Sequence, residues 1–203
     1  MAILIDTNIL LRLLQPHHPH CALVERALAT LRTRNETLSV TPQNLMEFWA
    51  VATRPTSENG LGMTAETAAA ELAAFQRLFT LLPETAMVFQ EWERLVATHQ
   101  VSGKNTHDAH IAAAMNVYGI TRILTLNVQD FARYSNISPL HPATVACPFF
   151  FESTRSGSLC VVRSAATRRA GERAGIRGWG LGIRGGKKHS PEPEVRRTVT
   201  SDK

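Results

Sequence analysis

Two aspartates of this sequence come just after apolar segments, at positions where a carboxylate could do chemistry. Asp6 follows the unbroken apolar run AILI, and Asp130 follows RILTL within RILTLNVQDF. A charge at the end of a buried strand is unfavourable unless it is paired or binds a cation. Each position also has a simpler interpretation, because Asp is a good N-cap for a following helix and Asp130 lies among turn-forming residues.

Two further acids lie on predicted helices. In THDAHIAAAMNVYG, Ile111 and Met115 follow Asp108 on one helical stripe, so Asp108 begins on the side that faces the core. It also lies in the first turn, where the helix dipole favours an ionised carboxylate. Glu47, in NLMEFWAVAT, points away from the apolar stripe of its helix, which by itself describes a solvated side chain. It gains interest because its helix follows the second predicted strand at the same end as Asp6.

Carboxylates gathered at one edge of a sheet predict a metal site. Like charges within a few ångströms raise one another's pKa and destabilise the fold unless a cation lies between them. An all-oxygen ligand set suits Mg²⁺ or Mn²⁺ better than Zn²⁺, and Mg²⁺ held by a few carboxylates keeps waters that a phosphate can replace. Such an ion can lower the pKa of a bound water and stabilise an in-line displacement. The residues alone therefore predict metal-assisted phosphoryl chemistry.

The scaffold that must position these residues is predicted to be α/β. Continuous apolar runs predict strands that are buried on both faces of a mainly parallel sheet; these are 2–5, 37–40, 79–82 and 122–126. Amphipathic segments predict helices between them; these are NILLRLL after Asp6 and roughly 20–32, 43–53, 64–77, 85–99 and 106–118. Thr64 resembles an N-cap and Gly119 a C-terminal glycine. Ligands of such sheets bind beyond the carboxyl ends of the strands.

The charge of the chain divides it into two parts. The net charge of +5 is unevenly distributed. Residues 1–147 contain 10 Lys and Arg and 12 Asp and Glu, whereas residues 148–203 contain 12 Lys and Arg and 5 Asp and Glu. Eight of the 12 glycines also lie in the second part. We therefore expect one folded domain over 1–147 and a disordered basic tail over 148–203. The tail has two interpretations, a nucleic-acid-binding arm or a dispensable extension.

Several other classes of protein are disfavoured by the sequence. No segment approaches the ~20 consecutive apolar residues of a membrane span, and the N-terminus lacks signal-peptide features, so we expect a cytoplasmic protein with no membrane partner. Three widely spaced cysteines without a CxxC motif argue against a disulfide framework. Neither a phosphate-binding glycine loop nor a GxSxG motif is present. The histidines of PHHPH (16–20), which are His17, His18 and His20, and the pair His107 and His110 are weak candidates for a transition-metal site.

The four acidic motifs resemble the PIN-domain family. IDTN, NLMEFW, THDAHIAA and TLNVQDF occur in the family's order over about residues 2–145, and their acids are separated by 41, 61 and 22 positions. The resemblance implies a PIN-like α/β/α sandwich and an Mg²⁺- or Mn²⁺-dependent ribonuclease, as in the VapC-like toxins of bacterial toxin–antitoxin pairs. It also implies that Asp6, Glu47 and Asp108 form the metal site and that Asp130 is a fourth, more variable member.

The same resemblance implies a substrate and partners. RNA would be hydrolysed by in-line attack to leave a 5′-phosphate and a 3′-hydroxyl, and the partners would be a cognate antitoxin protein and a second copy of the chain. Thr7 and Asn127 match polar positions that support the carboxylates. Lys104 and Arg54 could approach the phosphate backbone, although either could equally be a surface charge. Because a domain with net charge −2 binds RNA poorly, dimerisation, local basic patches or the tail must compensate.

Two other functions stay open at this point. A catalytically weak PIN-like scaffold could bind RNA or a protein, but a scaffold has no need to keep four acids that repel one another. A phosphotransferase or phosphatase could use Asp6 as a covalent nucleophile. Such enzymes usually carry a second Asp two residues later, where this sequence has Asn8.

Overall fold

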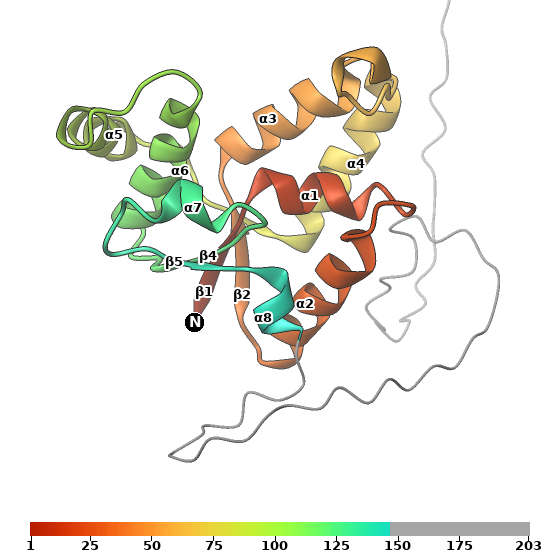
Figure 1. The fold of residues 1–203 in the computed structure, drawn as a ribbon, viewed down its shortest axis with the longest axis horizontal. Coiled ribbons are helices and arrows are strands. Elements are labelled where there is room, and N and C mark those ends of the chain that lie inside the picture. The colour runs from red at the N-terminus through yellow and green to blue at the C-terminus, as the bar shows by residue number, and fades with distance from the viewer. Residues whose placement is uncertain (147–203) are drawn as a thin grey trace, which may run out of the picture.

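The computed structural model describes residues 1–146, which form a five-stranded sheet between two layers of helices (Figure 1). The strand order is β3-β2-β1-β4-β5, and every pairing is parallel. The strands are β1 (Ala2–Ile5), β2 (Thr37–Val40), β3 (Thr80–Leu81), β4 (Arg122–Leu124) and β5 (Ser138–Leu140). The predicted parallel α/β architecture is therefore confirmed. The expected tail at 148–203 lies outside the described residues.

The central strand β1 explains why its sequence is continuously apolar. Ile3, Leu4 and Ile5 are all fully buried. Because successive side chains of a strand point to opposite faces, Ile3 and Ile5 join one hydrophobic core and Leu4 joins the other. The neighbouring strand β4 divides Leu124 and Ile123 between the same two cores.

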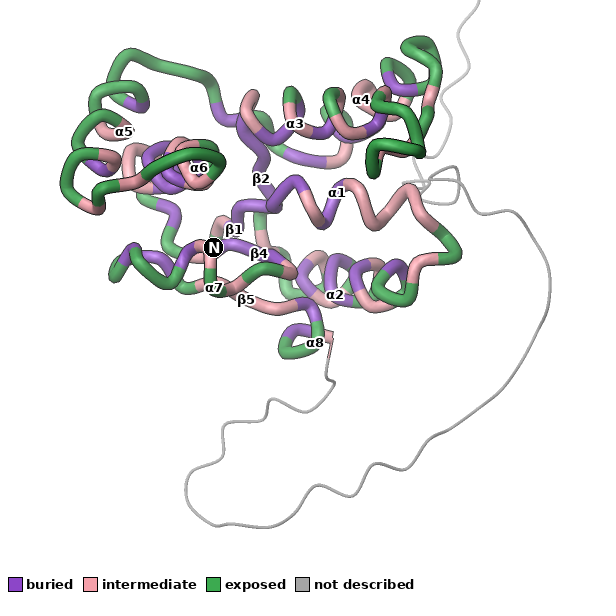
Figure 2. The backbone as a smooth tube through the Cα atoms, turned by 45° about the horizontal axis from the view of Figure 1, so that its top comes forward, coloured by how far each residue is buried: buried purple, intermediate pink, exposed green. Residues whose placement is uncertain are grey.

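Each face of the sheet is covered by its own helices, whose buried sides face inward (Figure 2). One core takes residues from α1 (Thr7–Leu13), α2 (Cys21–Thr33), α3 (Pro42–Thr53), α4 (Ala65–Leu78) and α8 (Pro142–Val145). The other takes residues from α5 (Ala86–Thr98), α6 (Asn105–Val117) and α7 (Val128–Phe131). A short 3-10 helix, η1 (Thr56–Glu58), lies between α3 and α4. None of the helices in residues 1–146 is both long and apolar enough to cross a bilayer.

The helix ends are set by local hydrogen bonds. At the start of α3, the Asn44 backbone N–H donates to Thr41 Oγ1 at 3.3 Å, and the Thr41 N–H donates to Asn44 Oδ1 at 2.9 Å, which is a capping box of two buried residues. The predicted N-cap Thr64 is confirmed, since its hydroxyl accepts from the N–H of Thr67. Gly119 adopts φ +65° directly after α6, as its predicted position requires.

The prediction for 79–82 is partly wrong. Only Thr80 and Leu81 form the strand β3, and both are exposed because this is an edge strand. The burial that makes the segment look like a core strand comes from the flanking Phe79 and Leu82. Strand β5 and the helices α7 and α8 were not predicted, because elements of three or four residues are too short to show a periodicity.

Candidate functional site

All four predicted acids line one cavity of about 630 Å³. Asp6 follows the central strand β1, and Asp130 lies on α7 beyond the end of β4. Glu47 projects from α3 and Asp108 from the first turn of α6. The cavity therefore lies at the carboxyl ends of the parallel strands, where ligands of such sheets bind. The structure brings together residues that are far apart in the sequence.

Asp6 is almost completely buried, with 7% of its surface exposed. It occupies the N-cap position of α1, but its side chain makes no capping hydrogen bond. Its Oδ2 instead accepts from Thr125 Oγ1 at 2.6 Å and from Asn8 Nδ2 at 2.7 Å. Burial raises the pKa of Asp6 to about 6, the Thr125 hydrogen bond opposes this rise, and the charges of Glu47 and Asp130 add to it. The carboxylate is thus held toward β4 and is not used as a helix cap.

Thr125 and Asn8 form a polar junction that sequence reasoning missed. Asn8 Nδ2 also donates to Thr125 Oγ1 at 3.1 Å, while Asn8 Oδ1 accepts from the N–H of Leu126 at 3.1 Å. The N–H of Asn127 donates to Thr125 Oγ1 at 3.0 Å. The junction therefore ties the end of β1 to the end of β4 and fixes Asp6. A signal was present, because Thr125 interrupts the apolar segment RILTL with a fully buried hydroxyl.

Glu47 is held in place from both sides. Thr7 Oγ1 donates to its Oε2 at 2.8 Å, and Gln43 Nε2 donates to its Oε1 at 2.8 Å. Asn44, the residue of the capping box, extends this chain by donating from Nδ2 to Thr7 Oγ1 at 3.2 Å. Thr7 thus supports a carboxylate, as the family resemblance implies. The same buried Asn44 that starts α3 also connects the helix to the site.

The pKa of Asp108 is raised further than that of Asp6. It rises to about 7, mainly because of burial and with contributions from the charges of Asp130, Asp6 and Glu47, while Arg133 opposes the shift. The four carboxylates therefore repel one another across the cavity. Such a cluster is destabilising when all members are ionised, and a bound cation relieves the repulsion.

The donor set of the cavity fits a hard divalent cation. Carboxylate oxygens are the ligands that Mg²⁺ and Mn²⁺ prefer, and no thiolate lines the cavity. Within residues 1–146, however, no three His, Cys, Asp or Glu side chains are already placed so that they could hold one ion together. Mutual repulsion keeps the four carboxylates apart. Asp6 is hydrogen-bonded to Thr125, and Glu47 is hydrogen-bonded to Thr7. An ion would have to draw these side chains together.

The other candidates of the sequence analysis lie in different places. Asn127 and Arg54 line the cavity, whereas Lys104 is an exposed residue at the start of α6 and does not. His107 lines the cavity, with Nδ1 2.9 Å from Gln43 Nε2, but His110 pairs with an acid elsewhere. The two histidines therefore do not point to a common zinc ion.

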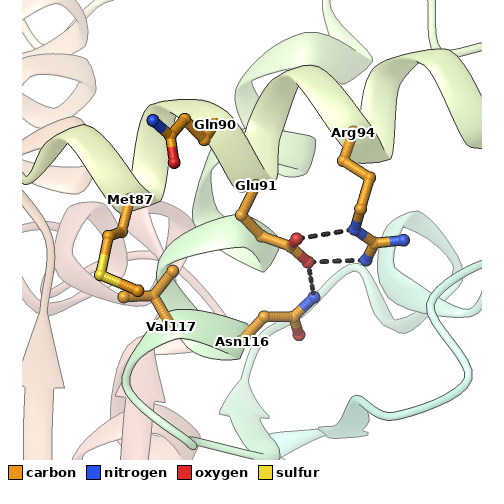
Figure 3. Close-up of a pocket in the computed structure, with 6 residues that line it drawn as sticks. All are labelled: Met87, Gln90, Glu91, Arg94, Asn116 and Val117. Atoms are coloured by element: carbon orange, nitrogen blue, oxygen red, sulfur yellow. Dashed lines mark hydrogen bonds and ion pairs between the residues drawn. The ribbon is translucent and has the colours of Figure 1, made fainter.

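A second cavity, of about 450 Å³, lies between α5 and α6 (Figure 3). Its acid is Glu91, which accepts two hydrogen bonds from Arg94 at 2.7 Å and one from Asn116 Nδ2 at 2.6 Å. The hydrogen bonds from Arg94 lower the pKa of Glu91 below its ordinary value. The charge of this cavity is satisfied internally, so the cavity of the four carboxylates is the better candidate for chemistry.

Comparison with known proteins identifies the class. The family model of the PIN domain matches residues 3–137, and the chain therefore belongs to the PIN-domain family. VapBC2 from Rickettsia felis, bound to a DNA fragment from its promoter, has 17% identity and a TM-score of 0.54 over 70% of this chain and 98% of that chain. VapBC-1 from nontypeable Haemophilus influenzae has 16% identity and a TM-score of 0.54 over 70% of this chain and 99% of that chain.

FitAcB from Neisseria gonorrhoeae has 16% identity and a TM-score of 0.52 over 70% of this chain and 99% of that chain. Likeness at these identities establishes the fold, which is the PIN-like α/β/α sandwich that the sequence predicts. No curated protein matches the sequence significantly.

Proposed function

We propose that this protein is a divalent-metal-dependent endoribonuclease and the toxin of a type II toxin–antitoxin pair. The observation that carries the proposal is the convergence of four carboxylates, from four separate segments of a PIN domain, on one cavity at the carboxyl ends of the strands. The structural neighbours support it, because they include VapBC and FitAB assemblies, and VapC-like proteins are the toxins of such pairs. The expected partners are a cognate antitoxin protein and a second copy of the chain.

Asp6, Glu47 and Asp108 would hold an Mg²⁺ or Mn²⁺ ion, and Asp130 would be a fourth, more variable member of the site. A divalent ion bound there supplies charge for the scissile phosphate and lowers the pKa of a water. The Thr125 hydroxyl keeps Asp6 oriented, and residues that hydrogen-bond a ligand in this way commonly tune a metal site. The reaction is hydrolysis of an RNA phosphodiester to a 5′-phosphate and a 3′-hydroxyl.

Incubation of the full chain with structured and unstructured RNAs tests this proposal. We expect cleavage with Mg²⁺ or Mn²⁺, none with chelator, and none in Asp6→Asn or Asp108→Asn. Glu93→Gln is the matched control, because it removes an exposed carboxylate outside the cavity and should leave cleavage unchanged. Full activity in either aspartate variant would remove the proposed mechanism.

The alternative is a catalytically weak PIN-like scaffold that binds RNA or a protein partner. One observation favours it, namely that three ligands are not already placed for an ion within residues 1–146. Thermal unfolding with increasing Mg²⁺ or Mn²⁺ separates the two functions. A nuclease site gains stability from the ion and loses that gain in Asp108→Asn, whereas a scaffold shows the same unfolding temperature with and without metal.

A further inference from the structure

The cavity does not end at the carboxylates but continues along one face of α3. Lining residues recur every three to four positions along α3 and its C-cap residue, so they form one helical stripe; they are Gln43, Met46, Glu47, Ala50, Val51 and Arg54. With a rise of 1.5 Å per residue, Arg54 lies about 10 Å along the helix axis from Glu47. Helix α1 packs beside α3 (Figure 1). It supplies Leu11 to the same arm of the cavity.

The middle of this arm is apolar. Leu11, Met46, Ala50 and Val51 line it, and Met46 leaves 59% of its surface exposed. An unbranched, polarizable Met side chain adapts to the shape of a bound group. Binding pockets for organic groups are mostly apolar with a few placed polar groups, and this arm has a polar group at either end. It therefore suits the base or ribose of a nucleotide.

Arg54 stands at the far end of the arm. It is the only Lys or Arg among the described residues that line the cavity. Its guanidinium has no hydrogen-bond or ion-pair partner within residues 1–146, so its charge is free for a ligand. A guanidinium matches the geometry of a phosphate through paired N–H donors.

The backbone of Arg54 is fixed even though its side chain is exposed. The N–H of Gly62 donates to the Arg54 carbonyl at 2.9 Å, and the N–H of Leu61 donates to the Val51 carbonyl at 3.0 Å. Gly60 passes so close that a Cβ on it would lie 1.9 Å from the Arg54 carbonyl oxygen. The loop after α3 thus folds back on the helix end and places Arg54 at the rim.

We propose that this arm is a subsite for the nucleotide next to the cleaved bond of single-stranded RNA, with Arg54 on its phosphate and Met46 under its base. The inference rests on the proposed function and names how the substrate is held. Four carboxylates repel a polyanion, so a cation at the other end of the cavity supplies the complementary charge. An unpaired strand is required because only unstacked bases can enter a pocket.

Binding of fluorescently labelled single-stranded RNA of mixed sequence, measured by anisotropy with Mg²⁺, tests the phosphate contact. The full chain carries Asp108→Asn so that the RNA stays intact. We expect Arg54→Gln to weaken binding about tenfold and to reduce the slope of log K against log salt by about 0.7, the contribution of one phosphate on a single strand. Arg34→Gln, which removes an exposed arginine outside the cavity, should change neither quantity.

A second pair of variants tests the apolar contact. Met46→Ser should weaken binding without changing the salt slope, and the loss should shrink when abasic RNA is used as the probe. Met87→Ser is the matched control, because Met87 is 64% exposed on α5 and lies outside this cavity.

Unchanged affinity and salt slope in Arg54→Gln would overturn the subsite. If Arg54→Gln leaves RNA affinity and the salt slope unchanged but weakens inhibition of the chain by a co-expressed protein partner, the arm binds a protein segment. That outcome also overturns the subsite. Failure of the proposed function looks different. RNA that binds in an Arg54-dependent way but is never cleaved with Mg²⁺ or Mn²⁺ refutes the nuclease and retains the subsite.

Discussion

The fold holds Asp6 in an environment that disfavours its ionised carboxylate. Its carboxylate is buried, yet it accepts hydrogen bonds from Thr125 and Asn8, which favour the ionised form. Burial and neighbouring acids outweigh these bonds, and the pKa rises to about 6. At neutral pH the protein therefore carries a charge that costs folding free energy, and under the proposed function a bound cation offsets that cost.

Asp6→Asn should make the metal-free protein more stable. A pKa raised from 3.8 to about 6 corresponds to about 3 kcal/mol of unfavourable free energy at neutral pH, and Asn can still accept from Thr125. We expect a gain of about 1–3 kcal/mol in denaturant unfolding at pH 7.5 with chelator. Glu93→Gln should leave the unfolding free energy unchanged. A less stable Asp6→Asn protein would contradict the electrostatic account.

Thr125→Val should remove the donor and keep the shape of the side chain. The change removes one of the two hydrogen bonds that Asp6 Oδ2 accepts and takes the acceptor from the Asn127 N–H, so we expect a loss of about 1–3 kcal/mol in the free energy of unfolding. We also expect a ten- to hundredfold loss of cleavage, about the usual effect of losing a residue that orients a metal ligand. Thr125→Ser restores the hydroxyl and should recover most of both losses. Equal defects in Val and Ser would show that packing, and not the hydrogen bond, matters here.

The convergence of the four acids on one cavity could be predicted from the sequence, but their hydrogen-bond partners could not. Asp6 and Asp130 follow apolar strands, and this position alone places them at one sheet edge. The bond between Asp6 and Thr125 joins residues 119 positions apart and depends on the register of β1 against β4. Asn8 was noted only as the place of a missing Asp, although its side chain connects the two strands.

Both ends of helix α3 contribute to the candidate site. Its N-terminal capping box leads into the hydrogen bonds around Glu47, and its C-terminus presents Arg54. The carbonyls of Val51, Ala52 and Arg54 are satisfied by the N–H groups of the loop that follows. One helix thus carries a carboxylate near one end of the cavity and a cation at the other.

Gly60→Ala should disturb the end of this helix. The added Cβ would meet the backbone of Arg54 at 1.9 Å, so the loop or the helix end must move. We expect a loss of about 1–3 kcal/mol in unfolding free energy and a drop in RNA affinity in the same direction as Arg54→Gln. Ser57→Ala, an exposed change in the same loop, is the control. Unaltered stability and RNA affinity in Gly60→Ala would mean that the close approach is not maintained in solution.

The long helices were easier to predict from the sequence than the short strands β3 and β5. Five helices of 12 to 14 residues were expected close to their observed bounds, because each shows several turns of periodicity. The edge strand β3 was mistaken for a buried strand because Phe79 and Leu82 flank it, and no local signal distinguishes flanking burial from strand burial. Strand β5 contains Pro139, which weakens any strand prediction.

For the whole molecule, the site predicts a pH dependence of stability. The pKa values of Asp6 and Asp108 are raised to about 6 and about 7, so between pH 4 and pH 7 these two carboxyl groups bind more protons in the folded chain than in the unfolded chain. In chelator, the contribution of this pair to the free energy of unfolding therefore falls as pH rises from about 4 to about 7 and is level above that. Saturating Mg²⁺ should reduce the fall.

Denaturant unfolding at a series of pH values, with chelator and with Mg²⁺, measures this effect. The double variant Asp6→Asn, Asp108→Asn is the control that should flatten the profile in chelator. A double variant with the same pH profile as the parent chain would show that other groups are responsible.

The central place of β1 has a consequence for how the protein is made. Strand β1 needs β4 as its neighbour on one side, and β4 is translated more than a hundred residues after β1. A nascent chain that has not reached residue 122 lacks Thr125 and Asp130 and cannot close the sheet around Asp6. If the protein is a toxin, translation must pass residue 130 before the chain can harm the cell that produces it.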